Sequence, residues 1–245
     1  MTQIYSEDLT VSYYDLDVSG RVKPSALLRI ANVVSDNHCK VLNVGYSQLR
    51  AFNYAFIITR LSMFIHVMPE YDQSIKVRTW SVGIDGPAFV RNGEILDESL
   101  RVMASWSGTW GLADIARHKF ARPSMLPTEV QHAGELGGKI RARRLSHPDE
   151  KLREPPREHA VSYRDVDYNG HVNNTAYLDI IMDALPFSVS SSLQMEELHI
   201  NYVNEARVGD VLDIKWGVWD DEILFKGLVK DSVCFQAAVK KAARA

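Results

Sequence analysis

The chain has 245 residues, of which 46% are hydrophobic, and its formal net charge at pH 7 is -3. This hydrophobic content is enough to build the core of one large domain or of two small ones. A slightly acidic chain does not favour a nucleic-acid-binding protein, which normally presents a strongly basic face. The two cysteines, Cys39 and Cys234, are far apart and lack a CxxC partner. This spacing excludes a disulfide framework and a cysteine-rich zinc site.

Residues 1–8 are partly acidic and contain no apolar run, unlike a secretory signal or a transit peptide. No segment approaches the roughly 18 consecutive apolar residues that a membrane-spanning helix needs. We therefore expect a cytoplasmic protein that binds neither membrane nor nucleic acid.

An internal repeat organises the chain. Residues 11–30 align without a gap with residues 161–180, and half of the aligned positions are identical. Such similarity at a single offset predicts a duplicated structural unit. A weaker similarity follows, in which Glu70 before Ile75 corresponds to Glu205 before Leu212.

Each copy changes from a turn to a helix and then to strands. Apolar residues at helical spacing predict one helix from Ala26 to Val34 and another from Ala176 to Leu185, with Asn173 or Asn174 as the N-cap of the second. Alternating apolar residues then predict antiparallel strands around 75–79, 102–110, 198–202, 212–218 and 233–239. The expected fold class is α+β, with two antiparallel sheets that each wrap around a long helix, the hot dog arrangement.

Residues 122–158 are rich in proline, glycine and charge, which is typical of a connector. The predicted domains are therefore residues 1–121 and residues 159–245, one for each copy of the repeat. Two linked copies can place their sheets edge to edge within one chain. A further homodimer remains open.

The copies differ at the start of the helix. The first copy has Asp17, Ser19 and Arg21, whereas the second has Asp167, Asn169 and His171. A carboxylate and an imidazole beside a tight turn can orient and deprotonate a water, and an amide can donate to a carbonyl oxygen. The helix N-terminus behind them offers unpaired N–H groups for developing negative charge. Only the second copy thus has the groups that hydrolysis needs.

The segment from Asp167 through Asn169, His171, Asn173 and Asn174 to Tyr177 resembles the signature of plant and bacterial acyl-acyl-carrier-protein thioesterases, which are tandem hot dog enzymes. The resemblance covers nearly the whole chain. It implies catalytic roles for Asp167, Asn169 and His171, and for Glu205 on the long strand that follows. Plant enzymes have a cysteine after that glutamate, whereas Ala206 stands here. Direct attack by water is therefore expected rather than a thiol nucleophile.

Each assignment has a structural alternative. Asp167 and Asn169 could only stabilise the turn through hydrogen bonds to the backbone, and Asp17 occupies the same turn in the first copy. Glu205 could be a solvated strand residue. The division of roles among Asp167, His171 and Glu205 stays open, because a carboxylate and a histidine near one water can exchange roles.

The resemblance implies hydrolysis of fatty acyl thioesters of acyl carrier protein in fatty acid biosynthesis, without cofactor or metal. The first copy, around 51–64 and 26–34, would shape the acyl pocket. Carrier proteins are acidic, so the basic run at 139–144 is a candidate docking patch at the mouth of the site. The alternatives are an acyl-CoA thioesterase, a non-catalytic acyl-binding module, and a dehydratase on the same fold.

Overall fold

The computed structural model describes residues 4–134 and 140–242. The first half contains β1 (Ile4–Thr10), η1 (Tyr13–Asp15), α1 (Pro24–Val41), α2 (Tyr46–Arg50), β2 (Tyr54–Ile65), β3 (Ser74–Asp85), β4 (Ala88–Leu96), β5 (Val102–Asp114) and β6 (Lys119–Ala121). After η2 (Pro123–Met125) and η3 (Asp149–Lys151), the second half contains β7 (Glu154–Ala160), α3 (Ala176–Ala184), α4 (Phe187–Ser190), β8 (Met195–Tyr202), β9 (Val211–Trp219), β10 (Glu222–Val229) and β11 (Ser232–Lys241).

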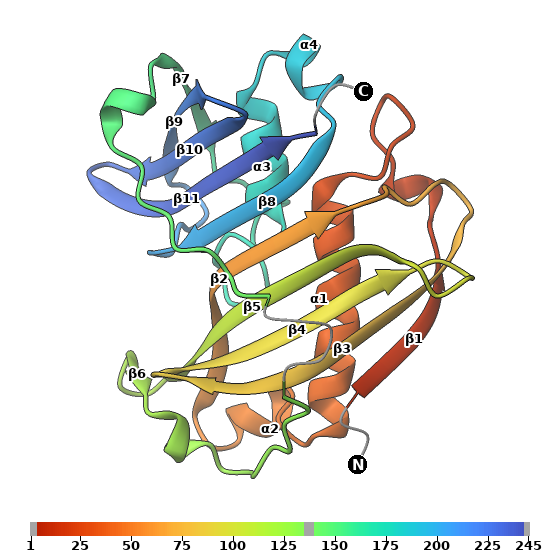
Figure 1. The fold of residues 1–245 in the computed structure, drawn as a ribbon. Coiled ribbons are helices and arrows are strands. Elements are labelled where there is room, and N and C mark those ends of the chain that lie inside the picture. Colours follow the sequence, from red (N-terminus) through yellow and green to blue (C-terminus); the bar gives the residue numbers. More distant parts are fainter. Residues whose placement is uncertain (1–3, 135–139, 243–245) are drawn as a thin grey trace.

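All strands join in one antiparallel sheet with the order β1-β3-β4-β5-β2-β8-β11-β10-β9-β7, and β6 pairs with β5 (Figure 1). The order in the second half mirrors that of the first. The two halves meet where β2 pairs with β8, for example at Leu61 opposite Ile200. The expectation of edge-to-edge copies is confirmed, but the two predicted sheets form one continuous sheet.

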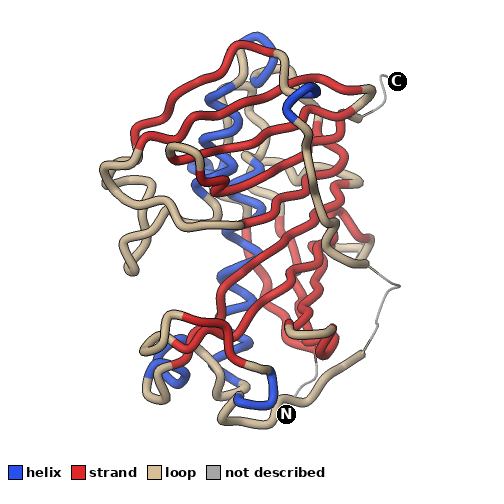
Figure 2. The backbone as a smooth tube through the Cα atoms, turned by 90° about the vertical axis from the view of Figure 1, so that its left-hand side faces the viewer, coloured by secondary structure: helices blue, strands red, loops and turns tan. Residues whose placement is uncertain are grey.

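Both main helices pack on the same side of this sheet, where Figure 2 shows them in blue. α1 and α3 contact each other, and the Ser25 hydroxyl donates to Asp179 Oδ1 at 2.6 Å. The apolar core is continuous across the halves: Leu27 and Met63 of the first belong to the same buried cluster as Ile181 and Ile200 of the second. The tandem hot dog architecture is thus confirmed: α3 ends one residue before the predicted end at Leu185, and α1 extends beyond both ends of the helix predicted at 26–34.

The aligned segments fold alike down to individual backbone hydrogen bonds. The Asp17 N–H donates to the Arg21 carbonyl at 2.7 Å, and the Asp167 N–H donates to the His171 carbonyl at 2.8 Å. Gly20 and Gly170 both have φ of +77°, a left-handed conformation that favours glycine. The duplication predicted from sequence is therefore present as repeated structure.

The weaker similarity between Glu70 and Glu205 was aligned wrongly. The Gln73 N–H donates to the Glu70 carbonyl, and in the second half the Asp210 N–H donates to the Arg207 carbonyl in the same position. Glu70 thus corresponds to Arg207. The two registers differ because α1 (Pro24–Val41) is longer than α3 (Ala176–Ala184) and β2 (Tyr54–Ile65) is longer than β8 (Met195–Tyr202), so an ungapped comparison cannot align this region.

The connector predicted at 122–158 contains the start of β7, which pairs with β9 from Glu154 onward. Before β7, residues 140–148 cross the face of the sheet that is opposite to the helices; we call this segment the strap. Its N–H groups at Arg143, Leu145 and His147 donate to side chains of β2, β8 and β11, namely Ser62, Asn201 and Gln236. The strap is therefore bonded to both halves.

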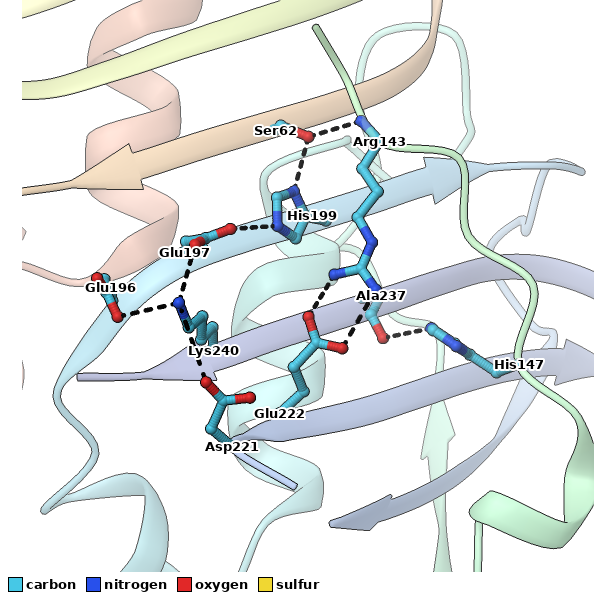
Figure 3. Close-up of polar contacts among 10 residues, drawn as sticks. All are labelled: Ser62, Arg143, His147, Glu196, Glu197, His199, Asp221, Glu222, Ala237 and Lys240. Carbon is cyan, nitrogen blue, oxygen red and sulfur yellow. Dashed lines mark hydrogen bonds and ion pairs between the residues drawn. The ribbon is translucent and has the colours of Figure 1, made fainter. Parts of the chain in front are cut away.

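A buried histidine lies beneath the strap, as Figure 3 shows. His199 is 2% exposed; its Nδ1 lies 2.7 Å from Ser62 Oγ, and its Nε2 lies 2.9 Å from Glu197 Oε2. The strap's Arg143 forms an ion pair with Glu222 on β10. Burial lowers the pKa of His199 below its ordinary value. The neighbouring Glu197 carboxylate opposes this shift but does not cancel it.

Candidate active site

Residues 167–171 form a tight turn between β7 and α3, and the turn is closed by its own aspartate. Asp167 Oδ1 accepts the Asn169 N–H at 2.8 Å, and Asp167 Oδ2 lies 3.5 Å from Asn169 Nδ2. In the first half, Asp17 Oδ1 accepts the Ser19 N–H at the same distance. Asp167 therefore stabilises the turn as Asp17 does, and any chemical role is additional.

His171 is the turn residue that meets the predicted acid. Its Nε2 lies 3.1 Å from Glu205 Oε2, with the two side chains 27% and 49% exposed. Glu205 lies in the loop after β8, whereas it was expected on the strand. Backbone contacts join this loop to the turn. His171 forms a β-bridge with Arg207, and the Val172 N–H donates to the Ala206 carbonyl. The sheet thereby brings together two residues that are far apart in sequence.

Glu205 has a second partner that the sequence did not indicate. Arg207 Nη2 donates to Glu205 Oε2 at 3.2 Å, on the same oxygen that faces His171. The Glu205 carboxylate is thus fixed between an imidazole and a guanidinium at the surface. A charge-assisted bond of this kind orients a carboxylate, although exposure to water weakens it.

Asn169 contacts the other half of the molecule. Tyr46, the first residue of α2, donates its hydroxyl to Asn169 Oδ1 at 3.2 Å. The Tyr46 ring lies edge-on to Tyr168, with the ring centroids 6.1 Å apart. Sequence reasoning missed Tyr46, because 123 positions separate it from Asn169 and no local pattern marks it. The site turn is thus completed by the half that lacks the asparagine and histidine.

Two N–H groups behind the turn are already hydrogen-bonded, one just before α3 and one at its first residue. Asn173 Oδ1 accepts the Thr175 N–H at 2.9 Å, and the Asn173 carbonyl accepts the Ala176 N–H at 2.9 Å. The prediction of Asn173 or Asn174 as the N-cap is wrong: the N-cap of α3 is Thr175, which makes no side-chain cap hydrogen bond, and Asn173 instead stabilises the turn before the helix. Because these two N–H groups are already bonded, they are not the free oxyanion donors expected from the sequence.

In the first half the equivalent turn is closed by side chains. Arg21 Nε donates to Ser19 Oγ at 3.0 Å, the Ser19 hydroxyl donates to Asp17 Oδ1 at 2.6 Å, and Arg21 Nη2 donates to the Ser191 carbonyl of the second half. The turn that lacks asparagine and histidine thus ties the halves together.

The two cysteines and Tyr177 are not candidates for a catalytic role. Cys234 on β11 is 1% exposed and packs with its thiol 3.9 Å from the Glu205 carbonyl; burial raises its pKa. Cys39 lies on α1, where Arg91 donates to its sulfur. Tyr177 is buried against Phe235, with ring centroids 5.0 Å apart, and burial raises its pKa as well.

The docking patch expected at the mouth of the site is not there. The described part of the basic run, residues 140–144, belongs to the strap on the outer face of the sheet, whereas residues 167–171 lead into α3 on the helix side (Figure 1). Arg143 is also engaged by Glu222. Lys139 lies outside the described residues. Two arginines do contact the site: Arg207 pairs with Glu205, and the Arg50 guanidinium lies 5.8 Å from the Tyr46 ring centroid.

Residues expected to shape the acyl pocket are packed core. Ile58, Leu61 and Met63 of β2 and Leu27 and Val34 of α1 are all buried in the common cluster. Their role in holding an acyl chain stays a prediction.

Residues 4–134 and 140–242 contain no cluster of three or more histidine, cysteine or acidic side chains that could hold a metal ion. Within the same ranges, no helix is both long and apolar enough to cross a membrane.

Comparison with known proteins matches both halves of the chain. The family model for the N-terminal domain of acyl-ACP thioesterases matches residues 2–130, and that for the C-terminal domain matches residues 149–234. Among curated relatives, acyl-[acyl-carrier-protein] hydrolase FATB3 of Cuphea viscosissima is 22% identical over 85% of this chain and 53% of its own length. Oleoyl-acyl carrier protein thioesterase 2 of Arabidopsis thaliana is 21% identical over 85% of this chain and 61% of its own. The chain thus spans between half and two thirds of these relatives.

Solved structures share the fold over the full chain. An acyl-ACP thioesterase from Bacteroides thetaiotaomicron aligns with a TM-score of 0.82 at 20% identity, covering 99% of this chain and 100% of its own. The 12:0-ACP thioesterase from Umbellularia californica aligns with a TM-score of 0.83 at 13% identity, covering 100% and 99%. With its two domains matched in order and this architecture shared, the chain belongs to the acyl-ACP thioesterase family.

Proposed function

We propose that this chain hydrolyses fatty acyl thioesters of acyl carrier protein, releasing a free fatty acid and the carrier thiol. The observation that carries the proposal is the 3.1 Å contact between His171 Nε2 and Glu205 Oε2, beside a turn whose counterpart in the first half has neither group. Family membership supports the substrate class, since the curated relatives are named for acyl-ACP hydrolysis.

In the proposed reaction, water attacks the thioester carbonyl carbon, the C–S bond breaks, and the departing sulfur takes a proton. Glu205 and His171 form a close carboxylate and imidazole pair that can accept the proton of the water and return it to the thiolate. Asn169 presents an amide that can donate to the carbonyl oxygen as negative charge develops. Asp167 fixes the turn that carries both residues, and its direct contact with water is a further part of the proposal.

A direct-water mechanism agrees with the surroundings of the acid. Ala206 follows Glu205 and has no nucleophilic group, and Cys234 is buried with a raised pKa. A thiolate nucleophile needs a lowered pKa and access to substrate, and Cys234 has neither. The cytoplasmic location expected from the sequence stays a prediction.

The test measures release of free thiol and fatty acid from matched acyl-carrier-protein and acyl-coenzyme A substrates. His171→Ala and Glu205→Ala should each lower kcat by about a hundredfold or more, the loss expected for a general acid/base group. His66→Ala, at an exposed histidine of the first half, is the matched control and should keep the wild-type rate. Cleavage of coenzyme A thioesters alone would reassign the carrier. Failure of the wild type on both substrates would refute hydrolysis.

A further inference from the structure

Tyr46 contributes a side-chain contact from the first half to the candidate active site. Its hydroxyl lies 3.2 Å from Asn169 Oδ1, and it starts α2, the short helix that follows α1. α2 is anchored from below by Leu49, which is 1% exposed and packs with Leu42 and Val44. A site residue is placed more accurately by an anchored element than by a free loop.

The backbone before Tyr46 also fixes its position. At Gly45, an added Cβ would lie 3.3 Å from the Lys40 Cα and 2.8 Å from the Gln48 side chain. The absence of a side chain therefore lets α2 pack closely against the end of α1. The Tyr46 ring is further confined by Tyr168 at its edge and by the Arg50 guanidinium 5.8 Å from its centroid.

The direction of the contact follows from the partner of Asn169. An ionised carboxylate only accepts hydrogen bonds, so Asn169 must turn its Nδ2 amino group toward Asp167. Asn169 Oδ1 then faces Tyr46, and because a carbonyl oxygen only accepts, Tyr46 must be the donor. One Nδ2 proton is directed at Asp167, and the second is left for a substrate carbonyl or a water.

The same arrangement occurs in the other half with different chemistry. There, Arg21 of the first turn donates to the carbonyl of Ser191, which lies after the helices of the second half. Each turn is therefore contacted by the segment that follows the main helix of the opposite half. In the first turn the contact ends in a backbone carbonyl, whereas in the second it ends on the amide of Asn169.

We propose that Tyr46 is a positioning residue for hydrolysis: it holds the Asn169 amide in the orientation that presents Nδ2 to the reacting thioester. This role rests on the proposed function. It makes the first half a participant in the chemistry of the second half, beyond shaping the acyl pocket.

The first test is Tyr46→Phe, which removes the hydroxyl and keeps the ring. Losing one neutral hydrogen bond to a catalytic amide should lower kcat about tenfold. KM should change less than twofold, because in this proposal the hydroxyl acts through Asn169 and not directly on the substrate. Tyr163→Phe is the matched control, since Tyr163 is 92% exposed near the same turn, and it should keep the wild-type kcat.

A double-mutant cycle separates positioning from a structural role. Tyr46→Phe should lower single-turnover rates in the wild type and have no further effect in Asn169→Ser, because the group through which it acts is gone. Equal losses in both backgrounds would overturn the proposal, as would an unchanged kcat of Tyr46→Phe. Wild-type turnover is measured beside every variant, so failure of hydrolysis itself is distinguished from failure of the Tyr46 role.

Discussion

At the scale of single residues, the candidate site consists of two series of side-chain contacts, and each series starts at the turn formed by residues 167–171. One runs from Asp167 through Asn169 to Tyr46, and the other runs from His171 through Glu205 to Arg207. Asn169 and Glu205 therefore each contact one side chain of the turn and one side chain outside it. Substitutions within a series should be strongly non-additive, since the residues act as a unit.

The cysteine beside this site should be structural. Cys234→Ala should keep kcat within about twofold, because burial raises the thiol pKa and leaves little thiolate at neutral pH. It should lower the free energy of unfolding by about 1–2 kcal/mol, as expected for removing a buried side chain. Turnover assays and urea denaturation measure the two effects, with Cys39→Ala for comparison. Loss of turnover in a folded Cys234→Ala protein would contradict the direct-water mechanism.

At the scale of elements, the two turns provide a matched pair. Gly20 and Gly170 share φ of +77°, and an added Cβ would meet no atom within 4 Å at either position. Alanine at each should therefore lower stability by a similar amount, about 1 kcal/mol, through backbone strain alone.

Activity should distinguish the two variants. Gly170→Ala should lower kcat at least tenfold, because a small shift of the turn moves Asn169 and His171 away from substrate. Gly20→Ala should stay within about twofold of wild type. Thermal denaturation and turnover are measured together, and equal activity of both variants would argue against a catalytic turn at residues 167–171.

Much of the arrangement of helices and turns could be predicted from the sequence. The repeat, the turn at 167–171 and the buried faces of both helices follow from local patterns, because short-range hydrogen bonds and helical spacing determine them. β2 was not recognised as a strand. Apolar residues stand next to one another at 56–58 and again at 63–65, so β2 as a whole does not show a simple apolar and polar alternation, although Leu61 and Met63 face the core and Ser62 faces the strap.

The rest of the site depends on pairing between distant strands. Glu205 reaches His171 because the loop after β8 is bridged to the turn at Arg207, and only the family resemblance indicated it in advance. Tyr46 depends on how the two halves pack. Neither contact can be predicted from the residues that lie next to it in the sequence.

At the scale of the whole molecule, the strap should make stability depend on pH. His199 and His147 lie beneath and within it, and burial lowers the pKa of both below the ordinary value of 6.5. As pH falls below about 6.5, the unfolded chain binds protons that the folded protein does not. The contribution of these two histidines to the free energy of unfolding is therefore fully present above about pH 6.5. It decreases as the pH falls, by up to about 1.4 kcal/mol per pH unit for each histidine.

His199→Gln should reduce this slope, because an amide does not titrate and can still bond to Ser62. Urea denaturation at pH 7.5, 6.5 and 5.5 gives the slope, and His66→Gln, at an exposed histidine, should leave it unchanged. A slope in His199→Gln equal to that of the wild type would contradict the assignment.

The continuous sheet across β2 and β8 has an evolutionary consequence. In an assembly of two identical subunits, every mutation is present twice, so a turn cannot lose its catalytic groups in one place and keep them in another. Once both copies are encoded in a single polypeptide, each can mutate independently. Arg21 and His171 occupy equivalent places in the two copies and show that divergence: Arg21 ties its turn to the second half, whereas His171 faces Glu205.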